Sequence, residues 1–136
     1  MFNPSTDNPF KLFNQWYEDA SKSEVNDPNA MSLATVGGNS MPSVRIVLLK
    51  SHDQNGFVFF TNLKSRKGTE LSKNPQAAIA FHWKTIRRQV RIEGSTEPVA
   101  KNEAEVRLCL GPRVLPRVRP AGAVARRRRR DAVSYT

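Results

Sequence analysis

The chain has 136 residues and a formal net charge of +10, from 22 Lys and Arg against 12 Asp and Glu, so it is long enough for one domain around a single core. A single cysteine excludes an internal disulfide, and no apolar stretch approaches the roughly 20 residues that a membrane-spanning helix needs. The first residues lack the basic and apolar segments of a signal peptide, and these features together predict a cytoplasmic protein.

The positive charge is concentrated at the end of the chain. Residues 1–106 hold 13 Lys and Arg against 11 Asp and Glu, whereas residues 107–136 hold nine Arg, one Asp and three Pro. We therefore expect a folded domain over residues 1–106 and an arginine-rich, disordered tail over residues 107–136. The five adjacent arginines at 126–130 would bind nucleic-acid phosphates without sequence preference, so a nucleic-acid-binding protein is one reading of the chain.

Residues 9–23 are predicted to form a helix. Asn8 can cap its start, and Pro9 suits the first helical turn. The apolar side chains recur on one helical face, at Phe10, Phe13, Trp16, Tyr17 and Ala20. We expect this face to pack against a core.

Five strands are predicted after this helix. They span residues 31–36, 44–49, 57–61, 77–83 and 89–93. Short turns at 37–39 and 53–56 favour antiparallel pairing. Ser65 can cap a short helix that ends near Lys73, and a last helix is expected from Pro98. The expected fold class is mainly β with flanking helices (α+β), arranged as a small barrel.

Cationic side chains cluster over residues 45–50, 66–67 and 87–91. Arg66 and Lys67 fall in the first turn of a predicted helix, where the helix dipole disfavours cations. A bound phosphate would offset that cost, because helix N-termini bind anions. The alternative that each cluster is a solvated face stays open. Strict alternation also places Arg45 and Lys50 on opposite faces of their strand unless the strand twists, bulges or ends between them.

Other chemistries find little support. One cysteine and two histidines do not favour a zinc site, so no metal is expected. His52 lies beside a turn and is expected to be exposed, whereas His82, within an apolar strand, is expected to be structural. No phosphate-binding glycine motif occurs, and no catalytic residue is identified.

Five short segments give a more specific signal. They are residues 29–36 (NAMSLATV), 45–50 (RIVLLK), 59–62 (FFTN), 65–67 (SRK) and 88–90 (RQV). In order and approximate spacing the chain from about Pro9 to Glu105 resembles the pyridoxamine 5′-phosphate oxidase family. The resemblance implies an FMN-binding split β-barrel that acts as a homodimer. It also implies oxidation of pyridoxamine or pyridoxine 5′-phosphate to pyridoxal 5′-phosphate, with oxygen as electron acceptor and hydrogen peroxide as product.

The resemblance also assigns residues to the cofactor. The FMN contacts that it implies are Arg45, Ile46, Val47, Leu48, Leu49, Lys50, Phe60, Thr61, Arg66, Lys67 and Gln89. Lys50 would also reach the substrate. These residue types suit the ligand, because a phosphate binds cations and hydroxyls and a flavin ring binds amide groups. The hydride chemistry itself belongs to the flavin.

After about Ala104 the chain departs from the family pattern. The tyrosine-containing helix and the Ser-Arg-Pro, Gln-Ser and Arg-Leu-His motifs do not occur, and the tail has the composition of GC-rich DNA read out of frame. We therefore interpret the chain as a truncated or frameshifted member whose barrel is incomplete at the C-terminus. The other interpretations are the nucleic-acid-binding protein above and a minimal flavin-binding or heme-binding split barrel.

Overall fold

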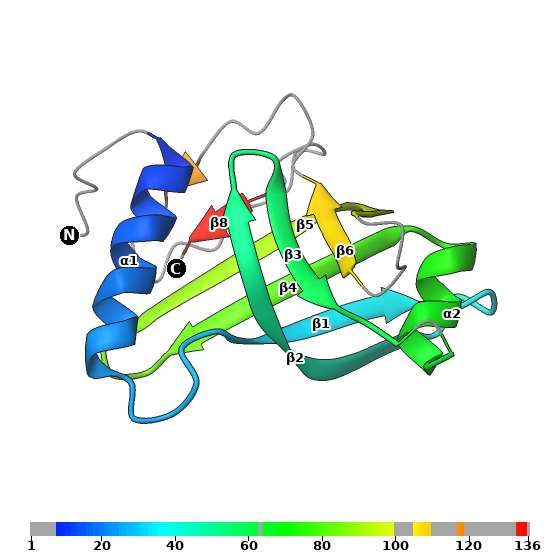
Figure 1. Ribbon diagram of the computed structural model, residues 1–136, viewed down its shortest axis with the longest axis horizontal. Helices are drawn as coiled ribbons and strands as arrows, with labels where there is room; N and C mark the ends of the chain where they lie inside the picture. The colour runs from blue at the N-terminus through cyan, green and yellow to red at the C-terminus, as the bar shows by residue number, and fades with distance from the viewer. Residues whose placement is uncertain (1–7, 63, 100–104, 110–116, 119–132, 136) are drawn as a thin grey trace.

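The computed structural model describes residues 8–62, 64–99, 105–109, 117–118 and 133–135. Its elements in chain order are α1 (Pro9–Ser23), β1 (Ala30–Val36), β2 (Pro42–Asp53), β3 (Gly56–Phe60), α2 (Arg66–Lys73), β4 (Gln76–Trp83), β5 (Arg88–Pro98), β6 (Glu105–Cys109), β7 (Arg117–Val118) and β8 (Val133–Tyr135). The two helices lie at opposite ends of the barrel that the strands form (Figure 1).

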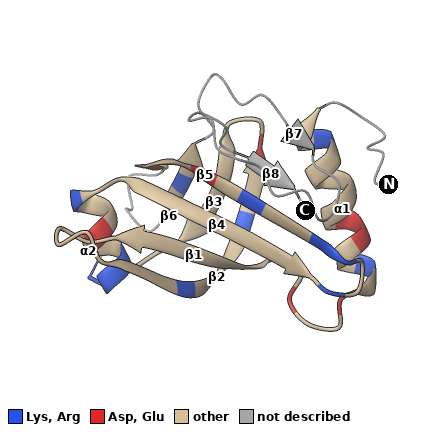
Figure 2. Cartoon of the chain, turned by 180° about the vertical axis from the view of Figure 1, so that it is seen from behind, with Lys and Arg blue, Asp and Glu red and all other residues tan. Residues whose placement is uncertain are grey.

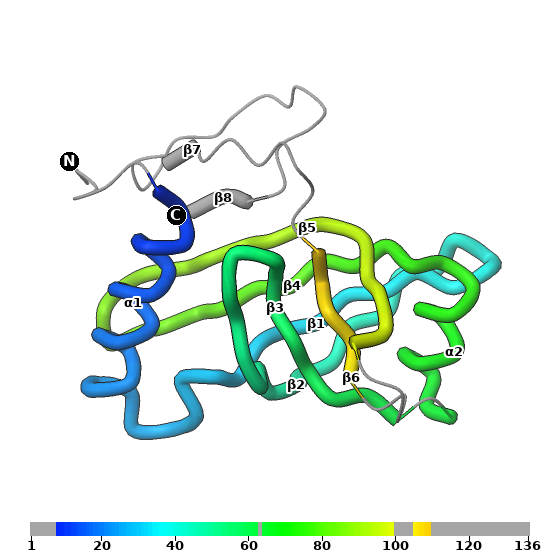
Figure 3. The backbone as a smooth tube through the Cα atoms, turned by 45° about the horizontal axis from the view of Figure 1, so that its top comes forward, coloured from blue at the N-terminus to red at the C-terminus, as the bar shows by residue number. Residues whose placement is uncertain are grey.

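Six strands close into an antiparallel barrel. They run in the order β4-β1-β2-β3-β6-β5, and β5 pairs with β4 to complete the ring. Figure 3 shows this ring as a tube, with the two helices outside its ends. The expected mainly β barrel with flanking helices is confirmed. The predicted strands β2 and β5 are longer than expected, because each continues past its apolar segment into polar residues.

The helix predicted from Pro98 is wrong over residues 105–109, which form β6 between β3 and β5. Val106 and Leu108 are buried, whereas the residues that alternate with them are half-buried. Alternation with period two is the pattern of a strand, and it outweighs the local helix propensity because these residues close the barrel.

The predicted tail begins inside β6. Farther along, β8 pairs with β5 and β7 pairs with β8. The arginine run at 126–130 and most other tail residues lie outside the described residues, so the disorder of the tail stays a prediction. No helix in the part of the chain that the structure describes is long and apolar enough to cross a membrane.

One end of the barrel is closed by α1. The Asn8 Oδ1 accepts hydrogen bonds from the backbone N–H groups of Phe10 and Lys11 at 3.0 and 3.4 Å, so the predicted cap is confirmed. The Phe13 ring is buried, and its centroid lies 5.0 Å from that of Phe57 and 5.8 Å from that of Trp83. Burial of a large aromatic ring stabilises the fold by about 1.5–3 kcal/mol, so this end is held by apolar packing.

The strand β2 changes phase near its middle. Its register with β3 shifts between Leu49 and Ser51, which leaves Lys50 as the extra residue of a β-bulge. Before the bulge Arg45 and Val47 face the barrel interior, and Val44, Ile46 and Leu48 face outward. After the bulge His52 faces inward toward α1.

Candidate functional site

The predicted cation pair lies at the start of α2, at the barrel end opposite α1 (Figure 1). A turn joins β3 to α2, in which the Ser65 N–H donates to the Asn62 carbonyl at 2.9 Å. The Ser65 Oγ then caps the helix by accepting from the Gly68 N–H at 3.2 Å. Arg66 and Lys67 follow this cap directly, beside the N–H groups of the first turn, where an anion is favoured. Lysines and arginines gather here and again where β4 turns into β5 (Figure 2).

Thr61, which directly precedes this turn, has a buried side chain. The residue is 5 % exposed, and its Oγ1 makes no hydrogen bond with any residue that the structure describes. A buried hydroxyl without a partner costs about 1–3 kcal/mol, so a ligand atom that accepts its proton would recover that free energy. The donor set of one hydroxyl, two cations and the helix N–H groups fits a phosphate group such as that of FMN.

The segment 45–50 on β2 divides between three environments. Ile46 and Leu48 face solvent, with exposed fractions of 66 % and 50 %, and Leu49 is buried in the core. Val47 packs partly buried against the core. The side chains of this segment therefore do not converge on one point, and a ligand along the outer face would meet Ile46 and Leu48.

Lys50 projects from the bulge. Its ammonium pairs with the Glu105 carboxylate and lies 4.6 Å from the centroid of the Phe60 ring. Phe60 is 56 % exposed, so the two predicted contacts form one accessible pair. The bulge breaks the strict alternation at Lys50, but Lys50 stays exposed while Arg45 faces the barrel interior, so the two cations remain apart.

Arg45 lies inside the barrel end that α2 covers. One terminal amino group donates to the Thr35 Oγ1 at 2.6 Å, and the other donates to the Ser43 Oγ at 2.7 Å. The second group also lies 3.8 Å from the Glu70 Oε2. Arg45 and Lys50 thus face different acidic partners, Glu70 and Glu105.

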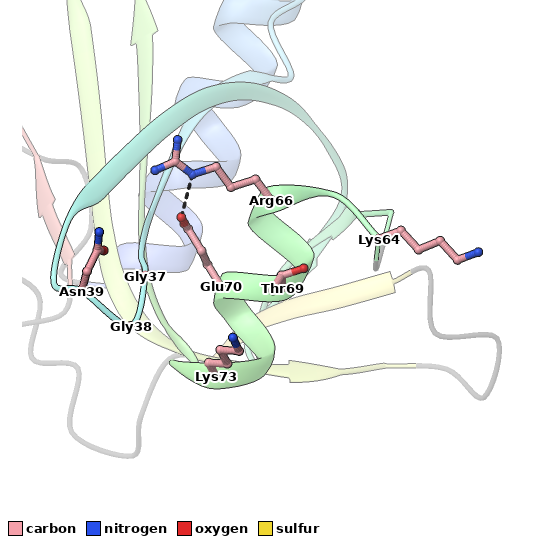
Figure 4. Close-up of a pocket in the computed structure, with 8 residues that line it drawn as sticks. All are labelled: Gly37, Gly38, Asn39, Lys64, Arg66, Thr69, Glu70 and Lys73. Atoms are coloured by element: carbon pink, nitrogen blue, oxygen red, sulfur yellow. Dashed lines mark hydrogen bonds and ion pairs between the residues drawn. The ribbon is translucent and has the colours of Figure 1, made fainter.

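Glu70 on α2 is the centre of this polar network. Its Oε2 accepts from the Thr35 Oγ1 at 2.5 Å and from the Ser43 Oγ at 2.8 Å, and its Oε1 accepts from the Arg66 Nε at 2.9 Å (Figure 4). The hydrogen bond from Thr35 is the main cause that lowers the pKa of the Glu70 carboxyl from 4.5 to about 2, followed by those from Arg66 and Ser43, while burial opposes them. The carboxylate is therefore charged at neutral pH, although only 9 % of its side chain is exposed.

A shallow cavity of about 400 Å³ opens beside this network. It is lined by Gly37, Gly38, Asn39, Lys64, Arg66, Thr69, Glu70 and Lys73. Figure 4 shows the Arg66 side chain directed toward Glu70, whereas the Lys64 side chain points away from it. The turn between β1 and β2 approaches closely, since a Cβ on Gly37 would lie 3.4 Å from the Glu70 Oε1. The small residue at this position leaves room for the carboxylate.

Gln89 lies at the other end of the barrel. It is half-buried on β5, opposite His82 of β4, and lines a cavity of about 350 Å³ with His82, Lys84, Arg87 and Arg88. The neighbouring pair Trp83 and Arg88 contacts α1 through Phe13 and Trp16. About 23 Å of strand separates Gln89 from Thr96, whose N–H donates to the carbonyl of Pro75 just after α2. Within one chain, Gln89 therefore lies near α1, at the barrel end opposite α2.

The structure thus brings some predicted residues together and separates others. Thr61 lies directly before the turn that Arg66 and Lys67 follow, and Lys50 contacts Phe60. Three residues of the polar network, Thr35, Ser43 and Glu70, were not predicted. The spacing of four between Arg66 and Glu70 was an available signal, because such pairs meet on one helix face.

The comparisons with known proteins agree with this geometry. A family profile described as "Pyridoxamine 5'-phosphate oxidase" matches residues 17–132. The chain is 55% identical over 113 residues to a pyridoxine/pyridoxamine 5'-phosphate oxidase of Granulibacter bethesdensis, covering 79% of this chain and 53% of that protein. It is 50% identical over 109 residues to the protein of the same name from Rhodopseudomonas palustris strain TIE-1, covering 80% and 51%. The chain spans about half the length of these curated relatives.

Among solved structures, the chain resembles PhzG from Burkholderia lata 383, solved in complex with tetrahydrophenazine-1-carboxylic acid. The TM-score is 0.69 at 29% sequence identity, and the match covers 76% of this chain and 53% of that one. The barrel topology and this match define a protein of the split-barrel class. Within that class, the chain belongs to the pyridoxamine 5′-phosphate oxidase family.

Proposed function

We propose that this chain binds FMN and serves in the oxidation of pyridoxamine or pyridoxine 5′-phosphate to pyridoxal 5′-phosphate, with oxygen as electron acceptor. The reaction belongs to vitamin B6 metabolism, and the proposed location is the cytoplasm. The observation that carries the proposal is the buried Thr61 hydroxyl, which has no hydrogen-bond partner among the described residues and lies just before the turn that presents Arg66 and Lys67. A relative 55% identical to the chain bears the name of this oxidase, which supports the choice of reaction.

In this proposal Thr61, Arg66 and Lys67 hold the FMN phosphate. Phe60, the segment 45–50 and Gln89 contact the remainder of the cofactor, and Lys50 also reaches the substrate. When bound, FMN supplies the capacity to accept a hydride, while the protein binds and orients both molecules. The accessible Lys50 ammonium suits a negatively charged substrate once it exchanges its Glu105 partner.

We further propose that the functional unit is a homodimer. Gln89 and the start of α2 lie at opposite barrel ends, so one FMN that contacts both would lie between two copies. An apolar stripe on the outer face of β2 supports this, since Val44, Ile46 and Leu48 are 68 %, 66 % and 50 % exposed. A cavity of about 160 Å³ beside the stripe is lined by apolar and small residues together with one cation and one carboxylate, namely Ser32, Ala34, Val44, Ala78, Ile79, Ala80, Arg91 and Glu93. A side chain of a second copy would fit such a cavity.

The first test is an FMN titration of the full chain. We expect quenching of the flavin fluorescence that saturates at one FMN per chain, and a dimer mass by light scattering. The variant Ile46→Glu is expected to shift the mass to that of a monomer, because a buried unpaired charge opposes association. A chain that leaves the flavin signal unchanged would contradict the proposed function.

The second test measures turnover with pyridoxamine and pyridoxine 5′-phosphate. We expect oxygen consumption, hydrogen peroxide and the absorbance of pyridoxal 5′-phosphate to rise together. The competing nucleic-acid reading predicts that the chain binds DNA, with a strong dependence on salt, and does not bind FMN. Flavin binding without turnover would leave the minimal flavin-binding barrel as the function.

A further inference from the structure

We propose that Glu70 is a positioning residue, which orients the Arg66 guanidinium so that its outer edge faces the phosphate of the ligand. The inference rests on the proposed function and deepens it, because it assigns a role to a residue outside the predicted contact set. Glu70 is not itself expected to touch FMN, since its carboxylate already accepts hydrogen bonds from three side chains of the protein.

The geometry of the Arg66–Glu70 contact is the first argument. Glu70 accepts from the Arg66 Nε and therefore uses only the inner position of the guanidinium. The two terminal amino groups of Arg66 make no hydrogen bond with any residue in the described part of the chain, and 66 % of the side chain is exposed. Those two groups form the fork that binds a phosphate through two parallel hydrogen bonds. Glu70 thus fixes the plane of the guanidinium and leaves the fork available.

The anchoring of Glu70 is the second argument. Its Oε2 accepts from Thr35 on β1 and Ser43 on β2, at 2.5 and 2.8 Å, so the carboxylate is held by two strands of the barrel. The exposed arginine is thereby connected through one side chain to the rigid sheet. An arginine held in this way loses less conformational freedom when it binds its ligand.

A purely stabilising role explains the network less well. The helix α2 already has its own cap at Ser65, and Leu71 packs it on the core. The more buried ion pair of the network joins Arg45 to Glu70, and such a pair is often no more stabilising than apolar residues of the same volume, because both charges lose hydration. The network holds the Glu70 carboxylate beside Arg66, where it orients the guanidinium. A site that binds an anion through an arginine requires that orientation.

The two roles of Glu70 predict changes of opposite sign, which makes the test sharp. If only its charge mattered, Glu70→Gln would tighten FMN binding, because a negative charge near the phosphate is removed. If it positions Arg66, the same variant weakens FMN binding. Riboflavin, which lacks the phosphate, separates an effect on the phosphate from an effect on the fold.

The experiment measures the Kd of FMN and of riboflavin for the wild type, Glu70→Gln, Glu70→Ala and the control Glu18→Gln. Glu18 lies on α1, is exposed, and loses the same charge far from α2. We expect FMN binding to weaken about tenfold in both Glu70 variants, with riboflavin binding and the Glu18 control unchanged. In the chain without flavin, we also expect the Arg66 Nε–H NMR signal to exchange faster with water in Glu70→Gln, since its carboxylate acceptor is gone.

Unchanged or tighter FMN binding in the Glu70 variants would overturn the proposal, as would an equal loss for FMN and riboflavin. In both cases the wild type still binds flavin, so the proposed function stands. A wild-type chain that binds FMN no better than riboflavin would also overturn it, since the phosphate then contributes nothing. Failure of the wild type to bind either flavin would contradict the proposed function itself, and the positioning role with it.

Discussion

The two ends of the barrel are closed by opposite means. At one end α1 contributes Phe13, which packs against aromatic rings from β3 and β4. At the other end α2 contributes Glu70, which binds hydroxyls of β1 and β2 and leaves cations exposed. Apolar packing is non-directional and supplies stability, whereas a hydrogen-bonded network fixes the direction of particular side chains. The α1 end therefore stabilises the domain, and the α2 end is suited to recognition.

The strongest test of this comparison is Phe13→Ala. The ring contacts Tyr17, His52 and three other aromatic residues, so its removal should lower the free energy of unfolding by about 3–5 kcal/mol. Urea unfolding of the chain without flavin measures this loss. Val25→Ala removes an apolar side chain that is 92 % exposed and should change stability by less than about 0.5 kcal/mol. Equal losses in the two variants would show that the α1 end is not the stabilising one.

The complementary test is the double variant Arg66→Ala/Lys67→Ala. Loss of two charge-assisted hydrogen bonds should weaken FMN binding on the order of 100-fold. The free energy of unfolding should fall by only about 1 kcal/mol, because Glu70 loses its hydrogen bond from Arg66 but keeps those from Thr35 and Ser43. Removal of cations from a helix N-terminus is even slightly favourable for the helix. The matched control is Lys11→Ala/Lys22→Ala, which removes two exposed charges from α1. A comparable loss of FMN affinity in the control would show that the effect comes from the net charge of the chain and not from the positions of Arg66 and Lys67.

A smaller effect is expected from acid at the α2 end. The folded pKa of Glu70 is about 2, below its ordinary 4.5, so the unfolded chain binds the proton first. The contribution of Glu70 to stability is therefore fully present above about pH 4.5 and is lost as the pH falls toward 2. We expect the unfolding curves of wild type and Glu70→Gln to differ at pH 6, to approach each other as the pH falls below about 4.5, and to converge only near pH 2. A difference in stability that stays constant across this pH range would show that the hydrogen-bonded network does not lower the pKa of Glu70.

Local chemistry made much of this fold predictable. The caps at Asn8 and Ser65 set both helix starts because a capping side chain binds N–H groups only two or three residues away. Turn residues and apolar segments likewise fixed the order of the first five strands. The candidate phosphate residues could also be found from sequence, since Arg66 and Lys67 follow their cap directly.

Long-range geometry accounts for what the sequence did not predict. Thr35, Ser43 and Glu70 meet only after β1, β2 and α2 have packed, so only the Arg66–Glu70 spacing, and not these three contacts, could be predicted from the chain. The two histidines were both predicted wrongly. His82 is exposed, because it alternates with the buried Phe81 and Trp83 of β4. His52 is half-buried, because the bulge at Lys50 shifts β2 by one residue and turns it inward.

The smallest predicted effect on stability comes from His52, which lies at the α1 end of the barrel. Burial among the rings of Phe13 and Tyr17 lowers the pKa of His52 below its ordinary 6.5, and the nearby Asp53 opposes this only in part. The unfolded chain therefore binds a proton more readily, so stability is complete above about pH 6.5 and declines as the pH falls below it.

Urea midpoints between pH 7.5 and 5.5 measure the decline, which should vanish in His52→Phe and persist in the exposed control His82→Gln. If His52→Phe kept the slope, the proton would be taken up elsewhere. If the slope is lost, the α1 end weakens as the pH falls below about 6.5, whereas the α2 end weakens only below about 4.5. Acid then weakens the two ends of the barrel one after the other.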